Sequence, residues 1–151
     1  MTKSYAGKEL QKYNNLYREI DDFYHDFAVQ SGLSDSALWI LYTICEQGEG
    51  CLQRDICSAA CVSKQTIHSA IHKLEQEGYL YLEAGKGHDK HIFLTEHGRT
   101  LAREKILPLI QMENAAFSDM GDEESQALLS LTEKYLKLLK AEAAGLTKNE
   151  P

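Results

Sequence analysis

The sequence predicts a mainly α-helical protein with one small β-hairpin, and three observations support this fold class. Apolar residues recur at steps of three and four over long stretches, which is the spacing of one face of an α-helix. Proline, which breaks helices, occurs only as Pro108 and Pro151. Between residues 79 and 95 the pattern changes to the alternation of a strand with one buried face, interrupted by a glycine-containing turn.

Two helices are expected in the first third of the chain. The first runs from Lys8 to Gln30, where the apolar residues form a single stripe. Gly32 interrupts this pattern, and Ser34 or Asp35 can then cap a second helix. The second helix should end before the Gly-Glu-Gly sequence at residues 48–50.

The middle of the chain is composed of shorter elements. We expect a short strand at Leu52, a short helix near Arg54–Ala60 and a longer helix over Lys64–Glu77. Ser63 is suited to cap the longer helix, and Gly78 is suited to end it. The hairpin follows, with strands in residues 79–84 and 91–95 and a turn at residues 85–90.

The C-terminal part again shows helical spacing. A helix is expected from Thr95 to Met120, with a kink at Pro108 and an end at Gly121. Asp122 can cap a last helix. In that helix the apolar residues repeat like a short coiled-coil seam, at Leu128, Leu131, Tyr135 and Leu138.

Composition sets limits on the class of protein. The 151 residues are 43% hydrophobic and 26% charged, as in an ordinary soluble domain, which argues against disorder and against a disulfide scaffold. No apolar run approaches the roughly 20 residues of a membrane span, and the N-terminus lacks a secretion signal, so we expect a cytoplasmic protein with reduced cysteines. The formal charge of −7, taken alone, argues against nucleic-acid binding.

The helix over residues 64–77 is the most informative element, because its two faces differ sharply. Ile67, Ile71 and Leu74 share an apolar face, while the opposite face is polar and carries no acid before Glu75. A short helix, a tight turn, this helix and a hairpin with basic residues form the layout of a winged helix–turn–helix, whose second helix enters the major groove of DNA. Gln65 is suited to adenine, and lysines in the hairpin are suited to phosphates.

Three segments resemble the MarR family of bacterial transcriptional regulators: LSDSALWILYTIC, VSKQTIHSAIHKLEQEGYL and IFLTEHG. The resemblance extends over about residues 8–144. It implies a homodimer joined by its N- and C-terminal helices, with two winged domains on a pseudo-palindromic operator in double-stranded DNA. One departure concerns the wing, where the family usually carries an Asp-x-Arg signature and this chain has Asp89-Lys90-His91.

These observations define the expected domains and the expected DNA contacts. Residues 35–98 form the winged helix–turn–helix, residues 1–34 and 99–146 form dimerisation helices, and residues 147–151 form a disordered tail. By similarity to the family, Ser63, Lys64, Gln65, Thr66, His68 and Ser69 would face DNA. The exposed face and the wing add His72, Lys73, Lys86, His88 and Lys90.

Five aromatic residues in the first two expected helices suggest an effector site. They are Tyr17, Tyr24, Phe27, Trp39 and Tyr42. The resemblance implies a small aromatic or lipophilic effector in this region, and therefore a ligand-responsive regulator, most simply a repressor. The alternative is that these rings belong to the core or to the dimer interface.

No cofactor or metal is expected, and no enzymatic activity. His68 and His72 have the i, i+4 spacing of a zinc pair, but zinc there would block the DNA-facing surface, and no nucleophile–base pair is indicated. Two alternative functions stay open. One is a winged-helix protein-interaction module without DNA binding, and the other is a redox-sensing regulator that uses Cys51 or Cys61.

Overall fold

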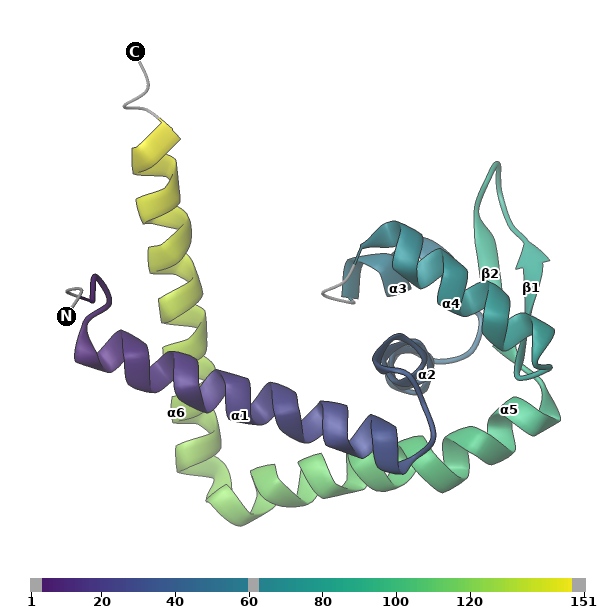
Figure 1. The fold of residues 1–151 in the computed structure, drawn as a ribbon, viewed down its shortest axis with the longest axis horizontal. Coiled ribbons are helices and arrows are strands. Elements are labelled where there is room, and N and C mark those ends of the chain that lie inside the picture. Colours follow the sequence, from purple (N-terminus) through teal and green to yellow (C-terminus); the bar gives the residue numbers. More distant parts are fainter. Residues whose placement is uncertain (1–3, 60–62, 148–151) are drawn as a thin grey trace. The chain divides into compact units, whose positions relative to one another are not determined.

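The computed structural model describes residues 4–59 and 63–147, and every structural statement below concerns these residues (Figure 1). The described residues form two compact units that divide between Leu107 and Pro108. The elements follow one another as α1 (Lys8–Gln30), α2 (Asp35–Gln47), α3 (Gln53–Ala59), α4 (Lys64–Gln76), β1 (Leu80–Ala84), β2 (Lys90–Leu94), α5 (Glu96–Leu101), a π-helical turn (Ala102–Ile106) and α6 (Leu107–Thr147). The predicted class, helical with one hairpin, is confirmed.

The core of the first unit is built around α2. This helix contacts α1, α3, α4 and the π-helical turn, and its residues Leu38, Ile40, Leu41 and Ile44 are almost completely buried. The buried side chains that surround it come from every neighbouring element and include Ile56, Ile67, Ile71, Leu80, Ile92 and Ile106. The remaining elements of the unit are therefore held by one apolar helix.

The helix boundaries follow the predicted capping residues. The Ser34 hydroxyl accepts a hydrogen bond from the Ala37 N–H at 3.1 Å, and the Ser63 hydroxyl accepts one from the Thr66 N–H at 3.2 Å. Gly78, after the last turn of α4, has a φ of +78°, which favours glycine. The predicted ends of α1, α2 and α4 are thereby confirmed within one residue.

The hairpin is antiparallel, with Leu80 opposite Leu94 and Leu82 opposite Ile92. Lys90 pairs with Ala84 and begins β2, so the turn is one residue shorter than the predicted turn at residues 85–90. The predicted strand at Leu52 is a single bridge to His91 beside the hairpin.

The chain after the hairpin departs from a regular α-helix at two positions. The π-helical turn Ala102–Ile106 ends two residues before Pro108. Proline provides no N–H and its ring crowds the carbonyl four residues earlier, so a widened turn at this point has a clear physical cause. At Gly121 the backbone leaves the helical region, with φ +78° and ψ 165°, which confirms the predicted break.

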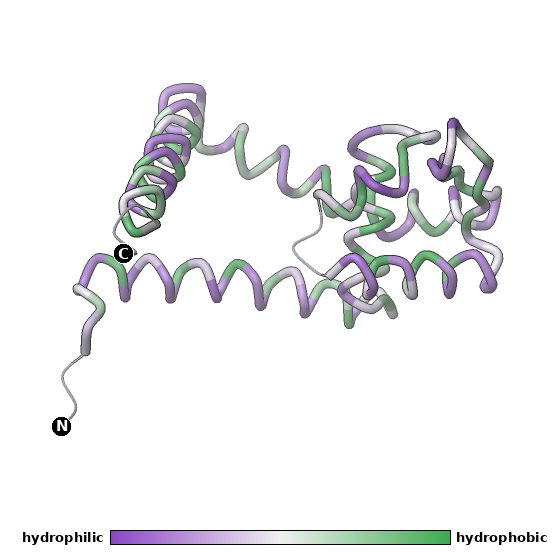
Figure 2. The backbone as a smooth tube through the Cα atoms, turned by 90° about the horizontal axis from the view of Figure 1, so that it is seen from above, coloured by the Kyte–Doolittle hydropathy of each residue, from purple (hydrophilic) through white to green (hydrophobic). Residues whose placement is uncertain are grey.

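Apolar side chains are exposed on one helix of each unit, and the alternating colours along both helices are visible in Figure 2. On α1, six large side chains are between 43% and 58% exposed: Leu10, Tyr13, Leu16, Tyr17, Ile20 and Phe23. On α6, the exposed set after the break includes Leu128, Leu131, Tyr135 and Leu138. No helix in the described ranges is long and apolar enough to cross a membrane.

Candidate nucleic-acid interface

Helix α4 is fixed to the core by one face and presents the other to solvent. Ile67, Ile71 and Leu74 are at most 3% exposed and lie three and four residues apart. On the opposite side, Lys64, Gln65, His68, Ser69, His72 and Lys73 are all exposed. The helix therefore has a defined orientation and an accessible polar face.

The first two turns of this face hold side chains without internal partners. Lys64, Gln65, His68 and Ser69 make no side-chain hydrogen bond or ion pair with any residue that the structure describes. We refer to these four residues as the α4 polar face. Their donors and acceptors are available to a ligand at no cost in internal hydrogen bonds.

Other predicted contact residues of α4 are engaged within the helix. The Ser63 and Thr66 hydroxyl oxygens lie 2.7 Å apart in the N-cap. Toward the other end of α4, His72 lies 3.1 Å from the Gln76 amide nitrogen, and Lys73 forms an ion pair with Glu77 at 4.0 Å.

The wing carries exposed basic residues, but its aspartate has a partner from another element. Lys86, His88 and Lys90 are exposed. Asp89 forms an ion pair of 3.5 Å with Arg54 of α3, whose side chain is 67% exposed. The list of DNA-contacting residues expected from the sequence omits Arg54, because nothing local indicates that α3 lies beside the hairpin turn.

The other two histidines of this region have packing contacts. His91 Nδ1 lies 2.7 Å from the Gly50 carbonyl oxygen, and this bond connects β2 to the segment before α3. The His97 ring stacks on Tyr79 with 4.5 Å between ring centres.

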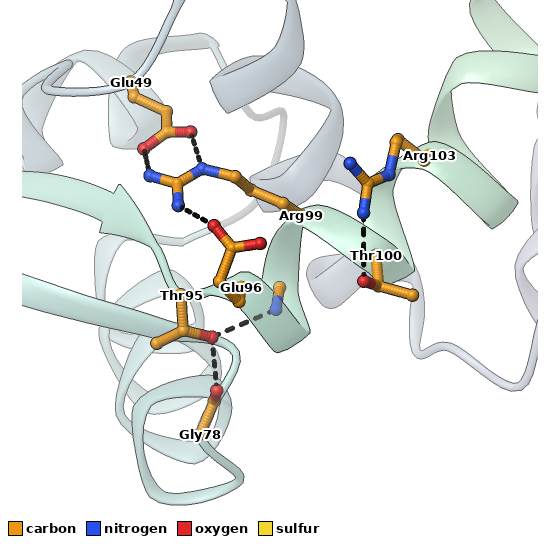
Figure 3. Close-up of polar contacts among 8 residues, drawn as sticks. Glu49, Gly78, Thr95, Glu96, Arg99, Thr100 and Arg103 are labelled. Carbon is orange, nitrogen blue, oxygen red and sulfur yellow. Dashed lines mark hydrogen bonds and ion pairs between the residues drawn. The ribbon is translucent and has the colours of Figure 1, made fainter.

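The wing is joined to α5 through Thr95 and Gly98 (Figure 3). The Thr95 hydroxyl donates to the Gly78 carbonyl at 2.6 Å and accepts the Gly98 N–H at 3.0 Å. Gly98 is buried, and a Cβ at this position would overlap the carbonyl oxygen of Tyr79. The Leu-Thr-Glu-His-Gly segment thus provides a cap, a hydrogen bond across elements and a close backbone contact.

Arg99 adds an ionic contact at the same junction. Its Nε and one terminal nitrogen donate to the two oxygens of Glu49 at 2.7 and 2.8 Å, and its other terminal nitrogen donates to Glu96 at 2.7 Å (Figure 3). The hydrogen bonds from Arg99 hold the pKa of Glu49 below its usual range. This pair connects α5 with the loop after α2.

Three of the five aromatic residues considered for an effector line one cavity. Tyr17, Tyr24 and Trp39 contribute to a cavity of about 570 Å³ formed by α1, α2 and α3. Phe27 and Tyr42 are not among its lining residues, although the centre of the Tyr42 ring lies 5.5 Å from the centre of the Trp39 ring.

The described thiols are partly buried. Burial raises the pKa of Cys45, Cys51 and Cys57 above its ordinary value, which lowers the fraction of reactive thiolate. Cys61 lies outside the described residues, as does Val62. Within the described part of the chain no three His, Cys, Asp or Glu side chains form a group that could hold a metal ion.

Comparison with known proteins agrees with this arrangement. Residues 31–90 match the family model described as "MarR family". No curated protein matches the chain. A MarR family regulator from Neisseria meningitidis has a solved structure that is 18% identical, with a TM-score of 0.79, and the match covers 95% of this chain and all of that one.

Two further solved structures contain ligands. A MarR family regulator from Listeria monocytogenes, complexed with 26mer DNA, is 20% identical, with a TM-score of 0.67 and coverage of 100% of this chain and 98% of that one. NadR in complex with 4-hydroxyphenylacetate is 18% identical, with a TM-score of 0.62 and coverage of 99% of both chains. The resemblance inferred from the sequence is confirmed: the chain has the fold of MarR family transcriptional regulators, and its residues 31–90 match that family.

Proposed function

We propose that the protein is a sequence-specific, DNA-binding transcriptional regulator that acts as a homodimer on a pseudo-palindromic operator. The observation that carries this proposal is the α4 polar face. It is accessible, it has free hydrogen-bonding groups, and the buried Ile67 and Ile71 hold it in place. The DNA complex of the Listeria monocytogenes relative supports the same use of the fold.

Local charge favours DNA binding although the whole chain is acidic. From Ser63 to Leu74 the sequence holds two lysines, two histidines and no acid. Lys86 and Lys90 add exposed positive charge on the wing, where the charge of Asp89 is offset by its ion pair with Arg54. Phosphates interact with the charge of the nearest surface, since more distant charges are screened over about 8–10 Å at physiological salt.

Each base-reading role follows from side-chain chemistry. The Gln65 amide can donate to and accept from one adenine, Lys64 can reach a guanine or a phosphate, and Ser69 can bond to either kind of base. Wing residues would supply phosphate contacts that position the domain without reading sequence.

A homodimer would cover the exposed apolar faces of α1 and α6. Leu16 on α1 and Leu138 on α6 are 52% and 53% exposed in the single chain. Contiguous apolar surface of this kind marks an interface in soluble proteins. A two-fold dimer would also place two α4 helices about 34 Å apart, so that both enter the major groove on one side of DNA.

Regulation by a small molecule forms the second part of the proposal, in which effector binding releases the operator and the protein acts as a repressor. The cavity beside Trp39 has the size of a small-molecule site. A ligand releases the operator if it binds more tightly to dimers whose two α4 helices are spaced wrongly for the major groove of DNA. NadR in complex with 4-hydroxyphenylacetate supports a ligand site in this fold.

Selection from a random duplex library, followed by fluorescence anisotropy, tests DNA readout. We expect an enriched duplex that binds tightly, with affinity that falls steeply as salt increases. Gln65→Ala should weaken binding to that duplex by about 1–3 kcal/mol and leave binding to a scrambled duplex unchanged. Gln47→Ala, at the exposed end of α2, is the matched control and should bind as the wild type. Failure to enrich any duplex would reject the proposal in favour of a protein-interaction module.

Sedimentation measures the oligomeric state. The chain has a mass of 17.0 kDa, so the dimer is expected at twice that value. Leu16→Glu and Leu138→Glu each place a charge in the proposed interface and should shift the protein toward the monomer. A wild-type monomer at the concentrations that bind DNA would contradict the dimer.

A further inference from the structure

The cavity formed by α1, α2 and α3 combines aromatic rings with carboxylates. Tyr17, Tyr24 and Trp39 supply the rings, and the Trp39 ring centre lies 5.1 Å from that of Tyr24. The other lining residues are Ile20, Asp21, Asp22, His25, Asp35 and Ala59. Among the described residues that line the cavity, none is a lysine or an arginine.

Among the described residues, Asp35 is the one carboxylate of the three that forms an ion pair, and its partner is His25. The two carboxylate oxygens of Asp35 lie 2.9 and 3.0 Å from His25 Nδ1. Asp21 and Asp22 form no hydrogen bond or ion pair with a described residue. Protonation of His25 cancels at most one of the three negative charges, so the cavity has a net negative charge whether His25 is charged or neutral.

We propose that this cavity binds an amphipathic organic cation, either a protonated arylalkylamine or an aromatic quaternary ammonium compound. The aromatic part would pack on Ile20 and the rings, and the cationic group would lie between Trp39 and the carboxylates of Asp21 and Asp22, which form no ion pair with a described residue. Cations are attracted both by aromatic faces and by carboxylates. This inference rests on the proposed effector function, for which it names the chemical class of the ligand.

An aromatic carboxylate is disfavoured by the same residues. A ligand such as 4-hydroxyphenylacetate, found in NadR, would bring a negative charge next to three aspartates. Among the described lining residues the one basic side chain is His25, whose Nδ1 lies 2.9 Å from Asp35, so an anionic ligand would meet no lysine or arginine there. The fold is therefore shared with NadR, while the lining here favours the opposite ligand charge.

A pair of ligands that differ mainly in charge tests this proposal. Tyramine and 4-hydroxyphenylacetate both carry a 4-hydroxyphenyl ring, with an ammonium group on the first and a carboxylate on the second. Trp39 is the only tryptophan, so its fluorescence reports binding at this site without DNA in the sample. We expect tyramine to bind at least tenfold more tightly at low salt, with a smaller difference at high salt. Equal or tighter binding of 4-hydroxyphenylacetate, or no tyramine binding by fluorescence and calorimetry, overturns the proposal.

Matched charge variants show whether the carboxylates are responsible. The double variant Asp21→Asn, Asp22→Asn removes two negative charges from the cavity and should lower tyramine affinity about tenfold. The control Glu9→Gln, Glu19→Gln removes two charges from exposed positions of the same helix outside the lining and should bind like the wild type. Equal tyramine affinity in the two double variants overturns the proposal. Because the titration needs no DNA, its result is separate from success or failure of operator binding.

Discussion

Replacing Gly98 by alanine should destabilise the junction between the wing and α5. Gly98 is buried in the first turn of α5, and an added Cβ would overlap the Tyr79 carbonyl oxygen. That oxygen belongs to the backbone and also accepts the Thr95 N–H at 3.1 Å. No side-chain rotation relieves this overlap, so the backbone before β1 must move away from α5.

The magnitude follows from three contributions. Overpacking a well-packed site costs about 1–3 kcal/mol, and weakening the Thr95–Tyr79 hydrogen bond costs about 1 kcal/mol. Alanine is about 1 kcal/mol better than glycine in a helix, which offsets part of the loss. The net expectation is a loss of about 1–3 kcal/mol, with 2 kcal/mol as the central value. For a chain of this length, 2 kcal/mol lowers Tm by about 4–8 °C.

Thermal unfolding followed by circular dichroism measures this effect. Gly145→Ala is the matched control, because that glycine is exposed on α6 and its added Cβ meets nothing within 4 Å. We expect the control to melt at or slightly above the wild-type temperature. All samples need the same protein concentration, since dimer formation would shift Tm by mass action. If Gly98→Ala melts with the wild type, the close-approach argument is wrong.

Three further predictions concern charge and thiol reactivity. Lys90→Ala should reduce the slope of log affinity against log salt by about one unit, and an unchanged slope would remove Lys90 from the DNA contact. The hydrogen bond that His25 donates to the Asp35 carboxylate raises the pKa of His25 above 6.5, so an NMR titration should show a raised value that falls in Asp35→Asn. The contribution of this pair to stability is complete below the unfolded-state pKa of His25 and is lost as pH rises through the raised folded-state pKa. A measured His25 pKa at or below 6.5 in the wild type would contradict the pairing. Burial raises the pKa of Cys45 and Cys51 and so lowers their thiolate fraction. Residue-resolved mass spectrometry should therefore find that iodoacetamide alkylates these two residues more slowly than free cysteine. Equal rates would show that burial does not protect them.

Features determined by neighbouring residues could be predicted from the sequence. The limits of α1 agree with the predicted range Lys8–Gln30, because the apolar stripe lies within the segment and Gly32 follows it directly after Ser31. The caps at Ser34 and Ser63 use a side chain three residues before its partner N–H. The break at Gly121 likewise depends on one residue and its own backbone freedom.

Contacts between distant segments could not be predicted in this way. Arg54 pairs with Asp89, and His91 bonds to the Gly50 carbonyl, because tertiary packing places the start of α3 beside the hairpin. No periodicity or spacing encodes either pair. The aromatic residues show the same limit. The sequence analysis grouped Phe27 with Trp39, but in the structure Trp39 lines the cavity and Phe27 does not.

The distribution of charge within α4 refines the proposal for DNA binding. A total of −7 describes the whole chain, but the acids of this helix are placed toward its end. There Glu75 lies 3.9 Å from His72, and Glu77 pairs with Lys73. The Glu77 pair offsets the positive charge of Lys73, whereas Lys64 at the helix start forms no ion pair with a described residue. If α4 enters the major groove, we therefore expect base contacts from its first two turns. The salt dependence of the affinity should then report how many of the dispersed cations contact phosphates, because the slope grows with that number.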